Sequence, residues 1–250
     1  MGVTGFRGAA TTQQRVIRGQ IQTSLDGRSG PISTERFEKR YHKDGTQTIM
    51  GALDASRYGV LVHVVYTISA DYRPLACYAR HDVRGEVSEG WFTFSDSQIE
   101  GEARLAGMGR VSQRLTVSQH PRSVLAGLVT TDGLICAAFA ENPTEGPFEC
   151  YALMDNFFER DKFDRGPLVR PYSWDRIEEL PRESLAGPGG EEVLARRFRW
   201  TWTRGPTPGP GSCVIWTSDD FVPLRLRADS MELTDVLVEV HTEIQEAGGQ

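Results

Sequence analysis

The chain has 250 residues, of which 39% are hydrophobic, 25% are charged and 9% are aromatic. A chain of this length and composition can bury a substantial core, so we expect an ordinary soluble globular protein. Its net charge of −6 argues against a surface that follows the phosphates of a nucleic acid, and nucleic acid is therefore excluded as an expected partner.

The chain contains no stretch approaching the roughly 18 apolar residues of a membrane span, and residues 1–14 lack the apolar core of a signal peptide. We therefore expect a cytoplasmic protein with no membrane span. The cysteines contain no CxxC pair and the histidines no HxH or HExxH pair, so we expect buried thiols, no metal site and no cofactor; the cysteines are Cys77, Cys136, Cys150 and Cys213.

Strand periodicity dominates the first half of the chain. Apolar and polar residues alternate in a series of segments: 16–25, 32–41, 46–52, 58–69, 75–83, 91–94 and 110–118. Asp26-Gly27 and Lys43-Asp44-Gly45 are turn signals between them, since glycine readily adopts a positive φ. Charged side chains that alternate along these strands indicate a solvated face.

The segment 58–69 is the strongest strand, because both of its faces are largely apolar. We expect it at the centre of a sheet, with one face packed in the core and the other lining a partly enclosed space. Val62, Val64 and Tyr66 share one face. His63 lies on the other, where its imidazole is expected either to meet a hydrogen-bond partner or to face an enclosed polar pocket.

Helical spacing appears around residues 121–140, where apolar residues recur at intervals of three and four. Asp132-Gly133 interrupts this pattern, so the segment predicts two short helices, with Pro121 in a first turn. Residues 141–190 are less regular and predict a long excursion of strands and loops, or a lid.

Alternation returns in residues 193–203, 212–217, 221–227 and 233–244. The expected fold is mainly β: a single curved antiparallel sheet, a half-barrel or open barrel, with a few short helices against the concave face. A Gly- and Pro-rich linker occupies residues 205–211, but no repeat and no domain boundary is evident, so residues 1–250 are expected to form one domain.

The order of elements over residues 190–244 resembles the C-terminal part of LolA-like lipoprotein-carrier half-barrels and related uncharacterised bacterial domains. In those proteins a Trp-bearing strand is followed by an acidic turn and a Pro-Leu-Arg strand; the matching residues are Trp216, Asp219, Asp220, Pro223, Leu224 and Arg225. The resemblance implies a curved sheet around an apolar cavity. The chain departs from the envelope carriers in lacking their export signal, which puts lipid transport in doubt.

Tyrosines and histidines gather on two neighbouring strands of the predicted sheet. A histidine in a partly apolar cavity can act as a general acid or base, and a tyrosine or aspartate can orient it. The candidate catalytic residues are His63, His81, Tyr66, Tyr78 and Asp82. Each histidine alone has a plainer explanation as a hydrogen-bonded residue of the sheet.

Aromatic and arginine side chains supply the candidate ligand-binding residues, which are Tyr58, Trp91, Trp200, Arg197 and Arg225. The tryptophans are alternatively core residues, and the arginines are alternatively solvated charges of the strands. An inward-pointing pair of arginines would instead bind a carboxylate.

These features predict a half-barrel that binds a hydrophobic or aromatic small molecule and performs cofactor-independent acid–base chemistry of the lyase or isomerase type. The alternative is a non-catalytic carrier or sensor of a lipophilic ligand, and a third possibility is a scaffold with a packed interior. A homodimer is compatible with each.

Overall fold

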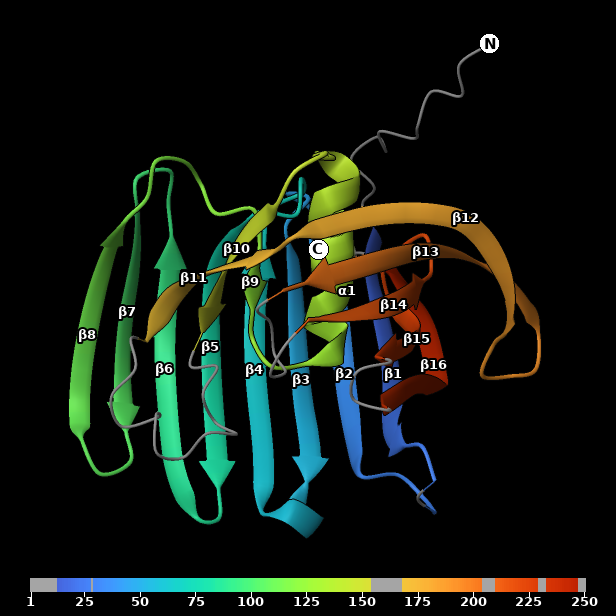
Figure 1. Cartoon of the computed structure of the whole chain (residues 1–250), viewed down its shortest axis with the longest axis horizontal. Helices are drawn as coiled ribbons and strands as arrows, with labels where there is room; N and C mark the ends of the chain where they lie inside the picture. Colours follow the sequence, from blue (N-terminus) through green and yellow to red (C-terminus); the bar gives the residue numbers. More distant parts are fainter. Residues whose placement is uncertain (1–12, 28, 154–167, 204–209, 229–232, 247–250) are drawn as a thin grey trace.

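The computed structural model describes residues 13–27, 29–153, 168–203, 210–228 and 233–246, and Figure 1 shows their arrangement. Thirteen strands form one antiparallel sheet, in the spatial order β12-β13-β14-β15-β16-β1-β2-β3-β4-β5-β6-β7-β8. Their bounds are β1 Gln13–Leu25, β2 Ser33–Tyr41, β3 Gln47–Ala55, β4 Val60–Ile68, β5 Pro74–Val83, β6 Glu86–Phe94, β7 Gln98–Leu105, β8 Gly109–Thr116, β12 Arg176–Ala186, β13 Glu192–Trp202, β14 Gly211–Thr217, β15 Pro223–Ala228 and β16 Leu233–Glu246.

The sheet is two meanders joined along one seam. β1 to β8 pair in chain order, β12 to β16 do the same, and β1 pairs with β16 in the middle. β8 and β12 remain as edges, so the sheet is not closed into a barrel. The mainly β, single antiparallel sheet expected from the alternation is confirmed.

The turn predicted at Lys43-Asp44-Gly45 also forms. Gly45 has a φ of 85° and its N–H donates to the His42 carbonyl at 3.0 Å. Asp44 accepts a hydrogen bond from the Thr46 N–H at 2.9 Å, which fixes the start of β3.

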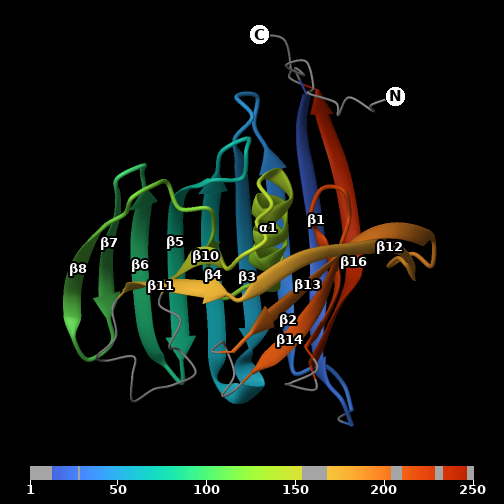
Figure 2. The ribbon, with the colours of Figure 1, turned by 45° about the horizontal axis from the view of Figure 1, so that its top comes forward.

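One helix and a small sheet cover the inner face of the large sheet. The helix α1 spans Val129–Glu141, and the small sheet contains β9 Val124–Leu125, β10 Phe148–Leu153 and β11 Val169–Trp174 in the order β11-β10-β9. Figures 1 and 2 show α1 between β2–β4 and the folded-over strands β13–β15, with β10 and β11 crossing the large sheet beside it. The concave side is therefore largely occupied by protein.

Two of the three hydrophobic clusters among the described residues are the larger ones. One joins β3–β8 to β9 and the start of β11, and the other joins α1 and β10 to β13–β15. Trp174 is central to the second, with its ring centroid 4.8 Å from that of Trp200 and 5.3 Å from that of Trp202.

The prediction of two short helices in residues 121–140 is wrong. Among the described residues there is one α-helix, which runs through Gly133, and a 3₁₀ turn η1 at Ser56–Tyr58, while residues 124–125 form β9. The helix keeps Gly133 because a Cβ atom there would lie 2.2 Å from the Phe221 carbonyl oxygen. The glycine permits close contact between α1 and the turn that precedes β15.

Residues 141–190 contain β10, β11 and β12, and residues 154–167 lie outside the described part of the chain. Two strands have little signal in the sequence. β7 turns small residues such as Gly101 and Ala103 inward, and a Cβ on Gly101 would approach the Phe92 ring at 2.9 Å. β12 is an edge strand rich in glutamate, with its register shifted between Leu180 and Glu183.

The charges of β2 do not all lie on a solvated face, contrary to the expectation from their alternation. Glu35 and Lys39 are each 1% exposed and lie on the inner face with Phe37. Glu35 accepts hydrogen bonds from the backbone N–H groups of Val129 at 2.7 Å and Thr130 at 3.0 Å. It therefore caps the N-terminus of α1, where the helix dipole favours a negative charge.

Lys39 connects β2 to the turn between β14 and β15. Its Nζ donates to the Asp220 carbonyl at 2.7 Å and lies 5.1 Å from the centre of the Tyr41 ring. Burial lowers the pKa of Lys39 to about 7. The Asp220 carboxylate accepts two hydrogen bonds from Arg15, at 2.7 Å and 2.5 Å, so the same turn is also held to β1.

Three carboxyl groups lie near the first turn of α1. Burial raises the pKa of Asp235 to about 7, although a hydrogen bond with Thr23 lowers this pKa. Burial also raises the pKa of Glu35 and of Asp132, and the charges of Glu35 and Asp235 act on Asp132. The three groups therefore disfavour one another's ionised forms.

Replacing Gly133 with alanine tests the contact between α1 and the β15 turn. In an exposed helix this change stabilises by about 1 kcal/mol. Here we expect Gly133→Ala to lower the free energy of unfolding by about 1–3 kcal/mol, because the new methyl group overlaps the Phe221 carbonyl. Chemical denaturation measures the difference, and a stabilised variant would show that α1 does not depend on this approach.

Asp235→Asn tests the buried carboxyl groups through pH. A carboxyl whose pKa is higher in the folded state stabilises most below its unfolded pKa of about 4, and that contribution disappears as the pH rises through about 7. The variant should match the wild type near pH 4 and exceed its free energy of unfolding by about 1 kcal/mol or more at pH 8. Urea denaturation of both proteins across this range measures the difference, and parallel curves would contradict the assignment.

Candidate functional site

The residues expected from the sequence to form a site do not come together. Three of them lie in the core on the inner face: Tyr66 is 0%, His81 1% and Trp200 2% exposed. Burial lowers the pKa of His81 to about 4, so this imidazole is neutral and poorly matched to acid–base chemistry near pH 7. Trp200 packs in the tryptophan cluster, as its alternative explanation as a core residue predicted.

Three other candidates lie on the outer face, which is the face of the large sheet opposite α1. His63 and Trp91 are exposed, and Tyr78 is half-buried with its ring centroid 5.1 Å from that of Trp91. The Tyr78 hydroxyl donates to the Glu89 carboxylate at 3.1 Å. The expectation that His63 faces an enclosed pocket is wrong, because His63 lies on the outer face of β4 and is exposed to solvent.

Two candidates belong to turns at the strand ends. Tyr58 ends the 3₁₀ turn η1 and is 42% exposed. Asp82 accepts a hydrogen bond from the Gly85 N–H at 2.9 Å and so stabilises the β5–β6 hairpin. Asp82 therefore has a structural role at the surface.

The two candidate arginines lie on the outer face of the other meander. Arg197 forms an ion pair with Glu183, which also accepts a hydrogen bond from the Trp216 indole at 3.1 Å. The Arg225 guanidinium lies 5.4 Å from the centre of the Trp216 ring. Both arginines therefore contact side chains on the outer face of the sheet. They do not form an inward-pointing pair that could bind a carboxylate.

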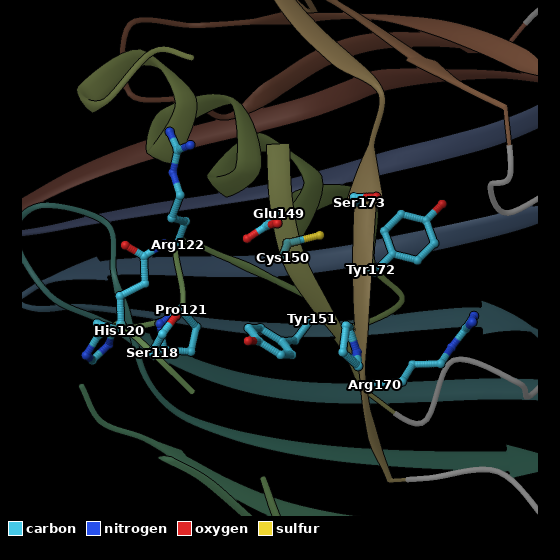
Figure 3. Close-up of a pocket in the computed structure, with 12 residues that line it drawn as sticks. Ser118, His120, Pro121, Arg122, Glu149, Cys150, Tyr151, Arg170, Tyr172 and Ser173 are labelled. Atoms are coloured by element: carbon cyan, nitrogen blue, oxygen red, sulfur yellow. The ribbon is translucent and has the colours of Figure 1, made fainter. Parts of the chain in front are cut away.

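A pocket of about 440 Å³ lies elsewhere, between the segment 118–122 and the strands β10 and β11. Figure 3 shows the side chains around it. Its lining consists of Ser118, Gln119, His120, Pro121, Arg122, Glu149, Cys150, Tyr151, Arg170, Pro171, Tyr172 and Ser173.

The register of the small sheet explains which side chains face this pocket. Glu149 lies opposite Ser173 and Tyr151 opposite Pro171, so these four share one face. In Figure 3 the side chains of Glu149 and Tyr151 point toward the segment 118–122, whereas those of Arg170 and Tyr172 extend to the other side of β11. The pocket therefore has a phenol and two prolines beside polar groups.

His120 is held firmly at one side of the pocket. Its Nε2 lies 2.7 Å from the Pro74 carbonyl oxygen and its Nδ1 lies 3.1 Å from the Asp96 carboxylate. Both ring nitrogens thus lie within hydrogen-bonding distance of oxygen atoms of the protein. The ring fixes the segment 118–122 to the large sheet and is not positioned for proton transfer to a ligand.

Arg122 packs at the edge of β10. Its guanidinium carbon lies 4.4 Å from the centre of the Phe148 ring, and one terminal nitrogen donates to the Asn142 carbonyl. Its Nε is buried without an acceptor within the described residues. Burial lowers the pKa of Arg122, and the negative charge of Glu149 acts against that shift.

Sequence reasoning missed this pocket because its lining comes from separate segments that carry no motif. The segment 118–122 was expected to lead into a helix, and β10 and β11 fall within the region expected to form a lid. The proximity of an aromatic side chain to cationic groups arises only when β9 pairs in parallel with β10.

The described residues contain no group of three or more histidine, cysteine, aspartate or glutamate side chains suited to a metal ion. All four cysteines are buried, and none of them forms a disulfide. In the part of the chain that the structure describes, no helix has the length and apolar character of a membrane span.

No protein family and no curated protein matches the sequence. Among solved structures, a β-barrel-like protein with a domain of unknown function (DUF1849) from Brucella abortus is 10% identical, with a TM-score of 0.47 over 92% of this chain and 98% of that chain. A protein with a YmcC-like fold from Bacteroides fragilis is 9% identical, with a TM-score of 0.30 over 91% of this chain and 95% of that chain. The resemblance to lipoprotein carriers over residues 190–244 stays a prediction.

Proposed function

We propose that the protein is a non-catalytic binding protein for a small organic molecule that combines an aromatic part with an anionic group. The ligand would occupy the pocket between the segment 118–122 and β10–β11. The observation that carries the proposal is the lining of this pocket, which brings Arg122 together with Tyr151 and Pro121.

The size and walls of the pocket suit such a ligand. A volume of about 440 Å³ falls within the roughly 300–1,000 Å³ of small-molecule sites. Tyr151, Pro121 and Pro171 offer flat apolar surfaces on which an aromatic ring can stack. The serine hydroxyls of Ser118 and Ser173 can donate or accept hydrogen bonds at the rim.

The anionic group follows from the positive charge of Arg122 in the pocket lining. A guanidinium has five N–H donors, and a carboxylate or sulfonate oxygen satisfies them better than water does in a partly buried site. Glu149 lies in the same pocket and weakens the attraction for an anion. This carboxylate favours ligands with a single negative charge over those with several.

Binding without catalysis is supported by where the titratable groups lie. His120 uses both nitrogens to hold the chain, His81 is buried in the core, and His63 is on the outer face. The proposal therefore follows the carrier or sensor alternative, with a more polar ligand than expected. Lyase or isomerase chemistry and a cytoplasmic location stay predictions.

Titration with 8-anilinonaphthalene-1-sulfonate, which has aromatic rings and one sulfonate, tests the proposal by fluorescence. Arg122→Gln should weaken binding about tenfold, because a charge-assisted hydrogen bond contributes roughly 1.5–3 kcal/mol and glutamine retains part of it. Ser173→Trp should also weaken binding, since Ser173 is exposed and the larger ring fills the pocket.

Tyr58→Ala and Arg110→Gln are matched controls, because both side chains are exposed and lie outside the pocket. They should bind the probe as the wild type does. Thermal denaturation of every variant separates lost binding from lost folding. Equal affinity in the wild type and in both pocket variants would reject the pocket as the binding site.

A further inference from the structure

A row of apolar side chains crosses the outer face of the first meander. Directly paired positions on four neighbouring strands place Met50, Val65, Tyr78 and Trp91 side by side. Val65 is 39% exposed and Trp91 53% exposed, although both lie on internal strands of the sheet. A contiguous apolar row of this kind on the surface of a protein indicates an interaction site.

Some of the charged side chains beside this row form ion pairs and others do not. On β7 and β8, Glu102 pairs with Arg110 and Glu100 pairs with Arg114, within 2.6 Å in each case. On β5 and β6, Arg80 and Glu89 are opposite each other in the register, yet neither forms an ion pair within the described residues. The polar contact of Glu89 is the hydrogen bond from Tyr78.

This arrangement is complementary to itself. A two-fold axis parallel to the strands and between β5 and β6 would set β5 of one copy over β6 of the other. Tyr78 would then meet Trp91 of the second copy, and Arg80 would meet Glu89 of the second copy, each contact occurring twice.

The neighbouring strands fit the same axis. β4 would lie over β7 of the second copy, so that Val65 meets the methylene groups of Glu102 and His63 meets Arg104. An imidazole nitrogen can accept a hydrogen bond from a guanidinium. No acid faces an acid and no arginine faces an arginine across the interface.

The available area is close to what a stable dimer requires. Six strands, β3 to β8, about 4.8 Å apart and with about eight residues each, cover roughly 700 Å². Standard interfaces bury about 800 Å² on each partner. Figure 1 shows these six strands side by side, with α1 and the small sheet on their other face.

We propose that a second copy of this chain covers the outer face of β3–β8, with the Tyr78–Trp91 pairs at its centre and reciprocal Arg80–Glu89 ion pairs beside them. Facing sheets pack with their strands within about 30° of each other, which this two-fold arrangement allows. The interface is separate from the ligand pocket, so it does not depend on the proposed function.

Sedimentation velocity from about 1 μM to about 200 μM measures the association, a range that covers the affinity of ordinary dimers. The wild type should dimerise, and Trp91→Asp should raise the dissociation constant at least thirtyfold, as expected for a central tryptophan. Leu194→Asp is the control, because Leu194 is 59% exposed and belongs to the other meander. It should dimerise as the wild type does.

Charge exchange tests the predicted axis. Arg80→Glu and Glu89→Arg should each be monomeric alone, because each would bring like charges together twice. Mixed in equal amounts they should form a heterodimer, since every contact then joins opposite charges. Thermal denaturation of each variant checks that the fold is retained.

A monomeric wild type over the whole range would overturn the proposal. A dimer that persists in Trp91→Asp would also overturn it, since association would then use another surface such as the β8 edge. Single charge variants that dimerise alone, or that fail to associate when mixed, would exclude this two-fold arrangement.

Discussion

The position of α1 depends on one buried carboxylate. Glu35 projects from the inner face of β2 and accepts hydrogen bonds from the first backbone N–H groups of the helix. Removing an ionised carboxylate from water is unfavourable unless it is fully hydrogen-bonded, and the helix N-terminus provides both the donors and the partial positive charge. Because the same helix carries much of the second core cluster, this contact also positions β13–β15.

The helix makes the interior a packed one. An open curved sheet invites the assumption of a ligand cavity on its concave side, but that side holds α1, β10 and β11. The described pocket lies at the margin, where the small sheet meets the segment 118–122, and it is polar. Under the proposed function, a ligand at the margin would enter and leave without unfolding any strand of the core.

Alternation of apolar and polar residues predicted most strands of the sheet, since β structure has a period of two and a half-buried strand displays it directly. It could not decide the surroundings of a strand that is apolar on both faces. Val64 and Val65 are neighbouring residues of the same type, yet the side chain of Val64 is 1% exposed and that of Val65 is 39% exposed. Only the position of α1, on one side of the sheet, distinguishes them.

The sequence contained a sign of the buried charges on β2 but none of the pocket. Glu35 and Lys39 alternate with Phe37 and Tyr41 in the pattern of a single face, and this spacing was an available sign that the charges are buried. The pocket had no comparable sign. The pocket residues come together only through the pairing of Val124 with Tyr151 and the contact of His120 with Pro74. Both contacts join segments that are far apart in the sequence or lack a regular pattern.

The seam between β1 and β16 has a consequence for how the chain is made. Each meander is built from neighbours in sequence, but Arg18 lies opposite His241. During synthesis β1 to β8 can therefore pair as they emerge, whereas β1 keeps an open hydrogen-bonding edge until the last strand has left the ribosome. For that interval the nascent protein is an unfinished sheet with a long exposed strand, the form in which chains most readily pair with the wrong partner and in which chaperones have most to do.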